Sequence, residues 1–331
     1  MQPNKNLRIF INYFLGPLLF AWLVFSIYKQ VMRQPELEAS WLKIRQSFQS
    51  SQLFYLVFAV LLIPVNWGLE AWKWKLSVKH IFPISFLQAF KAVLSGVSFS
   101  VTMPNRIGEY IGRMMYLPEG NRLKTISVTL VGSFAQLLVT ISFGISGLVF
   151  LKDDLVRGFQ DFTIWYQFIL YGLILIEAVL LLIYFNVGGT VYLFKKWIKA
   201  HRYEYLVEAL KYFHLRMLTR ILFISIIRYL VFITQYVLVF YLFEVNVPVF
   251  TIVMVMGVVF LAMSVIPSVT LVEIGLRGEI SIMLMGLFSG NKLGIGFSSI
   301  TVWFINLILP AIAGSLLILN LRIFKKKNEN R

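Results

Sequence analysis

Two short clusters of charged residues interrupt an otherwise apolar chain, and each cluster follows a proline, Pro104 or Pro267. Arginine binds phosphate and carboxylate groups through paired hydrogen bonds, and a neighbouring glutamate can orient its guanidinium group. The combination therefore predicts a binding site for an anionic group. The candidate binding residues are Arg106, Glu109, Arg113, Glu273, Arg277 and Glu279.

Each cluster places a glutamate four residues before an arginine, as Glu109–Arg113 and Glu273–Arg277. On a helix, this order favours an ion pair on one face. A charge at the centre of a bilayer costs about 2.5–3.5 kcal/mol, so each of these residues needs a partner or a water-filled cavity. The alternative interpretation is that both clusters are solvated loop charges that stabilise turns.

Two single charges, Glu177 and Arg228, lie within long apolar segments. The simplest interpretation is an ion pair between neighbouring helices, and a role in proton or substrate coupling is the alternative. Other reactive patterns are missing from the sequence. It contains no cysteine, its three histidines have no metal-ligand spacing, and no phosphate-binding Gly-Lys-Ser/Thr loop is present. We therefore expect no catalytic residue, no metal, no cofactor and no enzymatic activity.

The composition requires a membrane to position these residues. Hydrophobic residues make up 59% of the 331 residues and charged residues only 14%, and the mean hydropathy is +0.78. A soluble domain carries about 25% charged residues. The sequence therefore predicts an all-α integral membrane protein with about six full transmembrane helices, each near the roughly 20 residues that a bilayer requires. The expected spans are 9–27, 53–72, 125–151, 164–187, 221–243 and 298–319.

The distribution of basic residues predicts an orientation. The net charge is +16, but 22 of the 31 lysines and arginines lie in five regions that we assign to the cytoplasm, namely 1–8, 73–91, 104–124, 188–220 and 320–331. This pattern is typical of loops retained beside anionic lipid headgroups, and it argues against nucleic acid as a partner. We expect both termini in the cytoplasm, and we expect segment 152–163 outside.

Two shorter apolar segments, 86–103 and 250–266, do not fit a simple crossing, because their flanking regions fall on one side of the membrane. We expect each to begin a re-entrant hairpin that contains proline. The two hairpins would belong to inverted halves, 1–151 and 152–331, of a single domain. Coincidence between two proline-containing turns is the alternative. The residues that would shape the hairpins are Pro104, Gly108, Pro267 and Gly275.

The motif P-N-R-I-G-E-Y-I-G-R, which starts at Pro104, resembles a signature of the lysylphosphatidylglycerol synthase transmembrane-region family, the flippase-like domain. The sequence I-P-S-V-T-L-V-E-I-G-L-R-G-E resembles the second signature of that family, with Glu273 and bulky residues in place of glycines. The resemblance extends over essentially the whole chain. Because only a short tail follows the last span, we expect a stand-alone region without the soluble synthase domain.

The resemblance implies a flippase-like transporter that moves an anionic phospholipid or a polyisoprenyl-phosphate lipid between leaflets of the bacterial inner (cytoplasmic) membrane. Two other functions remain open from the sequence. A membrane-embedded transferase could use the same charges on lipid-linked substrates, and such an enzyme would usually need a divalent ion. A non-transporting partner subunit of a cell-envelope complex would tolerate neutralisation of Arg106 and Arg277.

Overall fold

The computed structural model describes residues 52–102, 107–122, 124–159, 162–189, 209–266 and 270–318, together with a few single residues before 52. Every regular element in these ranges is a helix, as the composition predicts. Five of the helices in the described ranges are long and apolar enough to cross a membrane. The expected span 9–27 lies outside the described residues.

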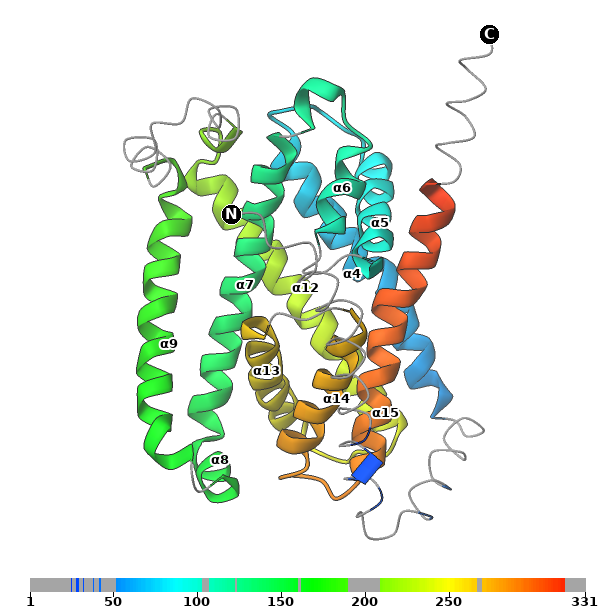
Figure 1. The fold of residues 1–331 in the computed structure, drawn as a ribbon, viewed down its shortest axis with the longest axis vertical. Helices are drawn as coiled ribbons and strands as arrows, with labels where there is room; N and C mark the ends of the chain where they lie inside the picture. Colours follow the sequence, from blue (N-terminus) through cyan, green and yellow to red (C-terminus); the bar gives the residue numbers. More distant parts are fainter. Residues whose placement is uncertain are drawn as a thin grey trace, which may run out of the picture.

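The five long helices run roughly along the long axis of the molecule (Figure 1). They are α4 (Leu53–Val78), α7 (Lys124–Phe150), α9 (Phe162–Phe185), α12 (Leu215–Leu242) and α15 (Lys292–Trp303), the last of which continues through a π-helical segment (Phe304–Ile308) to Ile318. Three are longer than predicted. In particular, α4 extends six residues beyond the predicted end of its span, so Lys73 lies inside a helix rather than in a cytoplasmic loop.

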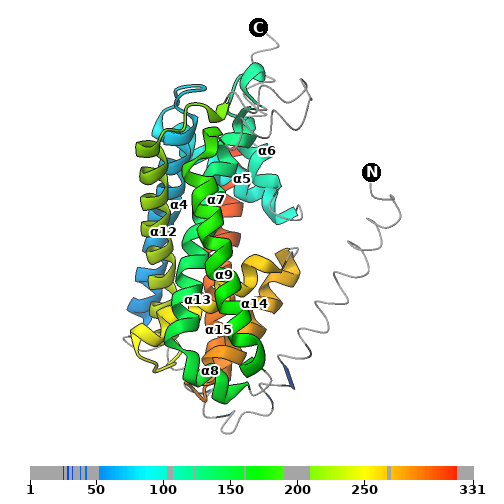
Figure 2. The ribbon, with the colours of Figure 1, turned by 90° about the vertical axis from the view of Figure 1, so that its left-hand side faces the viewer.

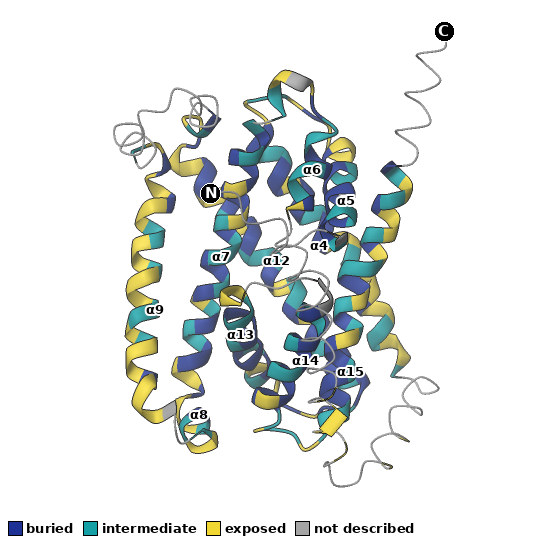
Figure 3. Ribbon diagram, viewed as in Figure 1, coloured by how far each residue is buried: buried dark blue, intermediate teal, exposed yellow. Residues whose placement is uncertain are grey.

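Burial separates the helices into a core and a periphery. Helices α7 and α12 bury many side chains, whereas exposed residues run along most of α9 (Figure 3). The exposed side chains of α9 are large and apolar, among them Ile164, Phe168 and Leu182 at 74%, 73% and 72% exposure. Such a surface is stable in lipid and not in water, which agrees with a membrane-spanning role for α9.

Four shorter helices form two helical hairpins. The first hairpin consists of α5 (Phe86–Thr102) and α6 (Gly108–Met114), and the second consists of α13 (Val249–Val265) and α14 (Thr270–Met285). The hairpins extend from opposite ends of the molecule, and the end of α5 and the start of α14 approach each other near its middle (Figures 1 and 2). The predicted apolar segments 86–103 and 250–266 therefore match α5 and α13 to within one residue at each end.

Glycine permits the close packing of the first hairpin. A Cβ atom on Gly108 would lie 2.2 Å from the carbonyl carbon of Phe99, and one on Gly112 would lie 2.3 Å from the backbone nitrogen of Gly96. Both distances are shorter than any van der Waals contact, so α5 and α6 can approach this closely only without side chains there. Gly108 was predicted to shape this hairpin. Gly275 is buried within α14 of the second hairpin.

The ends of the long helices fall into two groups, one at each end of the molecule (Figure 1). The end of α4, the start of α7, the end of α9, the start of α12 and the end of the α15 segment lie at the same end of the molecule (Figure 1). We call this the α6 end. The short helix α8 (Lys152–Gly158), the 243–248 turn and the start of α15 lie at the opposite end. A short 3₁₀ turn (Glu119–Asn121) lies between α6 and α7, at the α6 end.

Candidate functional site

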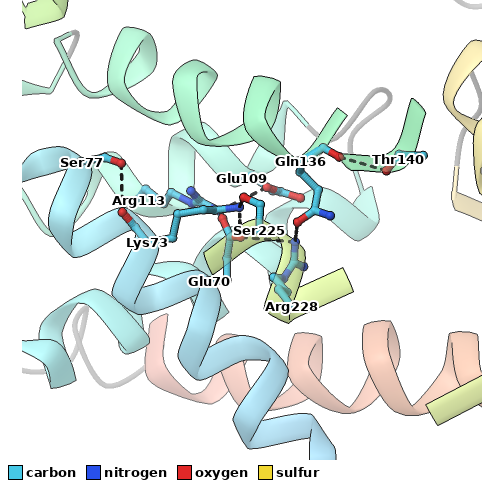
Figure 4. A network of polar contacts seen from close by, with 9 residues as sticks. All are labelled: Glu70, Lys73, Ser77, Glu109, Arg113, Gln136, Thr140, Ser225 and Arg228. Atoms are coloured by element: carbon cyan, nitrogen blue, oxygen red, sulfur yellow. Dashed lines mark hydrogen bonds and ion pairs between the residues drawn. The ribbon is translucent and has the colours of Figure 1, made fainter. Parts of the chain in front are cut away.

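A buried glutamate, Glu70 on α4, gathers three cations from three helices (Figure 4). Its carboxylate oxygens lie 2.7 Å from Nζ of Lys73, 2.9 Å from Nη2 of Arg113 and 3.3 Å from Nη1 of Arg228. The side chains of Lys73 and Arg113 are only 2% and 3% exposed. Ion pairs shielded from solvent in this way are much less screened than pairs on a surface.

Further polar groups extend this network. Arg113 also lies 3.3 Å from Oε2 of Glu109, which is the predicted i,i+4 pair. Arg228 donates a hydrogen bond of 3.2 Å to Oε1 of Gln136 on α7, and its guanidinium lies 5.4 Å from the ring centre of Trp67. The network therefore connects the first hairpin with three of the long helices.

The second hairpin supplies a separate charged pair. Arg277 on α14 lies 2.6 Å from Oε1 of Glu273, which is the second predicted i,i+4 pair. It also donates a 3.1 Å hydrogen bond to the hydroxyl of Tyr236 on α12, and its guanidinium lies 5.8 Å from the ring centre of Phe260. The guanidinium group of Arg277 is therefore held by three contacts, to Glu273, Tyr236 and Phe260.

A cavity of about 160 Å³ joins the two groups of charges. Both hairpins contribute to its wall, as do all the long helices except α9. Several lining residues stand close to the midpoints of their helices, so the cavity lies near half the depth of the helix bundle. The lining residues are Asn66, Trp67, Ser100, Glu109, Gln136, Thr140, Arg228, Tyr229, Phe232, Phe260, Glu273, Arg277, Trp303, Asn306 and Leu307.

A break in helix geometry places one of these residues. The π-helical segment Phe304–Ile308 contains Asn306, which accepts a hydrogen bond of 3.0 Å from Asn66 of α4. Single π-helical turns are rare and frequently occur at functional sites. The extra residue in the turn changes which side chains of α15 face α4, and here it presents an amide to the cavity.

The cavity also contains polar groups with no partner in the described part of the protein. The indole nitrogens of Trp67 and Trp303 and the hydroxyl of Tyr229 are buried and make no hydrogen bond there. Buried donors without a partner cost about 1–3 kcal/mol each. Three such donors around one cavity indicate that it is suited to a ligand with hydrogen-bond acceptors.

The charges around the cavity do not cancel. The two groups contain four cations and three carboxylates, which leaves one net positive charge among these described residues. The members are Lys73, Arg113, Arg228, Arg277, Glu70, Glu109 and Glu273. An anionic ligand is therefore favoured over a cationic one.

The structure distributes the predicted binding residues as follows. Glu109, Glu273 and Arg277 line the cavity, and Arg113 lies behind Glu109 in the Glu70 network. Glu279 is not among the lining residues, although it belongs to the same helix as Arg277. Three further predicted residues, Arg106, Pro104 and Pro267, lie outside the described residues.

The predicted ion pair between Glu177 and Arg228 is wrong. Arg228 pairs with Glu70, and the carboxylate of Glu177 on α9 instead accepts a hydrogen bond from Ser142 of α7. Two isolated opposite charges in long apolar segments suggested each other as partners, but helix α7 packs against α9 and supplies a nearer polar group.

Sequence reasoning missed Asn66, Glu70 and Lys73. A local signal was present, because spacings of four and three residues place all three on one face of α4. Lys73 was instead counted as a loop residue. The helix α4 therefore continues beyond residue 72, where the hydropathy of the sequence falls, because Glu70 and Lys73 pair inside it.

The described residues contain no group of three or more histidine, cysteine, aspartate or glutamate side chains that could hold a metal ion. The fold and cavity define a multi-pass helical membrane protein with a charged internal site. The family model of the lysylphosphatidylglycerol synthase TM region matches residues 13–314, and the chain belongs to that family. No curated protein sequence matches the chain.

Proposed function

We propose that this protein is a transporter, rather than an enzyme, that moves a lipid with an anionic phosphate headgroup between the two leaflets of the membrane. The observation that carries the proposal is the cavity near half depth, with charged residues from both hairpins in its wall. Membership of a family of lipid-related membrane regions supports the same substrate class, an anionic phospholipid or a polyisoprenyl-phosphate lipid.

The proposed role of the cavity follows from its two lining arginines. Arg228 and Arg277 each hold one carboxylate now, Glu70 and Glu273 respectively. A phosphate group that enters the cavity would accept hydrogen bonds from the same guanidinium groups, because arginine binds phosphate with paired hydrogen bonds. The carboxylates would compensate the arginines whenever the lipid is elsewhere, since an uncompensated buried charge is strongly destabilising.

The hairpins would make this movement possible as re-entrant elements. Each would enter the membrane from one side and end near its middle, in two inverted halves of the kind found in many secondary transporters. The opposite directions of the two hairpins in Figures 1 and 2 support this arrangement. A substrate site between two such hairpin tips would be equally distant from both leaflets.

We propose the orientation in which the α6 end faces the cytoplasm, with both termini there and the protein in the bacterial inner membrane. The α6 end carries Lys211 near the start of α12, whereas α8 at the opposite end begins with Lys152, Asp153 and Asp154. Because the chain has no native cysteine, Lys211→Cys and Asp153→Cys can be labelled singly in intact cells. An impermeant reagent should label only Asp153→Cys, and the reverse result would invert the orientation.

Reconstituted liposomes test the transport itself. Purified protein would be reconstituted with a trace of acyl-labelled fluorescent phosphatidylglycerol, and a membrane-impermeant reductant would measure the fraction of label in the outer leaflet over time. Arg228→Gln and Arg277→Gln should each slow translocation about tenfold or more, because hydrogen bonds to charged groups contribute about 1.5–3 kcal/mol.

The matched control is Arg157→Gln. Arg157 is 76% exposed on α8, at the end of the molecule opposite the α6 end, and it does not line the cavity. Its substitution should therefore leave the rate unchanged. Folding of every variant would be checked by size-exclusion chromatography. If both cavity variants transport at the rate of the control, the cavity is not the transport site.

A further inference from the structure

A second concave site lies outside the charged cavity and shares none of its lining residues. It is a groove of about 780 Å³ between the last third of α4 and the first turns of α12. Its apolar wall includes Trp72 and Phe223, which are 51% and 60% exposed. Most of the groove surface is apolar, and Arg216, Thr219 and Arg220 also contribute to its lining.

Two arginines of this groove lie on the same face of α12. Arg216 and Arg220 stand four residues apart on α12, both are exposed, and neither forms an ion pair within the described part of the chain. Like charges at this spacing on a helix repel each other. An anion held between the two guanidinium groups would remove that repulsion, so the pair is complementary to a phosphate.

The residues that line the groove lie at different distances from the ends of α4 and α12. Arg216 and Arg220 lie in the first two turns of α12, and Trp72 lies six residues before the end of α4. At about 1.5 Å per residue, all three lie within about 10 Å of the helix ends. Tryptophan and arginine are both enriched at this level, where the headgroups meet the hydrocarbon. Phe223 lies deeper, at the level of acyl chains.

We propose that this groove binds one anionic glycerophospholipid from the leaflet at the α6 end. Its phosphate lies between Arg216 and Arg220, and one acyl chain lies along Trp72 and Phe223. The phospholipid is the occupant that the groove favours, because a free phosphate would leave the apolar wall unused and a neutral lipid would leave the arginines unpaired. The proposal does not depend on the transport function.

A lipid in this groove would contact the two helices that carry the Glu70–Arg228 ion pair. The groove joins α4, which carries Glu70, to α12, which carries Arg228, and the same two helices meet in the Glu70–Arg228 ion pair. A lipid that bridges the two helices at one end restricts their separation. Its binding therefore stabilises the folded protein.

The experiment compares the full-length protein and the double variant Arg216→Gln/Arg220→Gln in neutral detergent. Phosphatidylglycerol or phosphatidylcholine is added in mixed micelles, and native mass spectrometry counts bound lipids while thermal melting reports stability. Phosphatidylglycerol should raise the melting temperature of the wild type more than phosphatidylcholine does. The double variant should bind phosphatidylglycerol about thirtyfold more weakly, because each arginine near a membrane surface contributes a factor of about five.

Three controls make each outcome decisive. Arg216→Lys/Arg220→Lys keeps both charges and should keep most of the lipid, which excludes misfolding as the cause of a loss. Inorganic phosphate or glycerol phosphate should not reproduce the thermal shift, and an equal shift would overturn the assignment to a lipid. Arg277→Gln should retain the groove lipid. If the glutamine double variant binds as many lipids as the wild type, the groove proposal is wrong while the transport proposal stands.

Discussion

Replacement of Glu70 by glutamine should destabilise the protein strongly, because one buried carboxylate compensates three cations. The carboxylate oxygens lie 2.7, 2.9 and 3.3 Å from Lys73, Arg113 and Arg228, and the Glu70 side chain is only 9% exposed. Removal of one partner from a buried ion pair costs about 3–5 kcal/mol. Glutamine keeps the size of the side chain, so the loss would measure charge rather than packing.

The cost should not fall equally on the three cations. Arg113 retains Glu109 at 3.3 Å, and Arg228 retains a hydrogen bond to Gln136. In the described structure, Lys73 retains only a 3.5 Å hydrogen bond to Ser225. Gln136 is neutral, so neither Lys73 nor Arg228 keeps a carboxylate, but Lys73 is the more deeply buried of the two, at 2% against 19% exposure. Glu70→Gln/Lys73→Met should therefore recover a large part of the lost stability.

The assay is the free energy of unfolding in mixed micelles that contain increasing fractions of a denaturing detergent. The matched control is Asp154→Asn, which removes one carboxylate from the exposed Asp154–Arg157 pair on α8. Exposed pairs contribute about 0–1 kcal/mol, so this variant should be almost neutral. The reasoning fails if Glu70→Gln is no more destabilising than the control, or if Lys73→Met adds to the damage.

Two further predictions concern packing and partner choice. Gly112→Ala should destabilise the first hairpin by about 1–3 kcal/mol through overpacking. The control Gly172→Ala on α9, where an added Cβ meets open space, should be neutral or stabilising by up to about 1 kcal/mol. Equal melting temperatures for the two variants would refute the close packing of α5 and α6. In double-mutant cycles, Arg228→Ala should couple with Glu70→Ala by about 0.5–3 kcal/mol but should be additive with Glu177→Ala. Coupling to Glu177 and none to Glu70 would restore the pair expected from the sequence.

The sequence predicted those features that depend on local patterns. Hydropathy located the five described spans, and the short apolar segments 86–103 and 250–266 correspond closely to α5 and α13. The spacing Glu–x–x–x–Arg correctly predicted both ion pairs within α6 and α14. In each case, all the information lies within one helix, where spacing alone determines which side chains share a face.

Ion pairs between residues on different helices could not be predicted from spacing in the sequence. Arg228 and Glu70 are separated by more than 150 positions, and nothing local distinguishes Glu70 from Glu177 as the counter-charge. The end of α4 was misplaced for a related reason. Hydropathy treats Lys73 as a polar residue that ends a span, but an adjacent carboxylate allows a buried lysine to continue the helix. A hydropathy scale scores each residue by itself, so it does not recognise a buried charge whose partner lies elsewhere in the protein.

The cost of the charged residues explains why the cavity and its network belong together. At the centre of a bilayer a charge costs about 2.5–3.5 kcal/mol, so the seven charges around the cavity would cost on the order of 20 kcal/mol if each were alone. The pairs at Glu70, Glu109 and Glu273 offset most of that cost, but among the described residues they leave one positive charge in excess. A purely structural network gains nothing from this excess, because an apolar core of similar volume is often more stable than buried ion pairs. An anionic headgroup would complete the neutralisation, and the same protein without that ligand would be less stable. Binding of an anionic ligand and stability of the folded state would therefore be linked at this site.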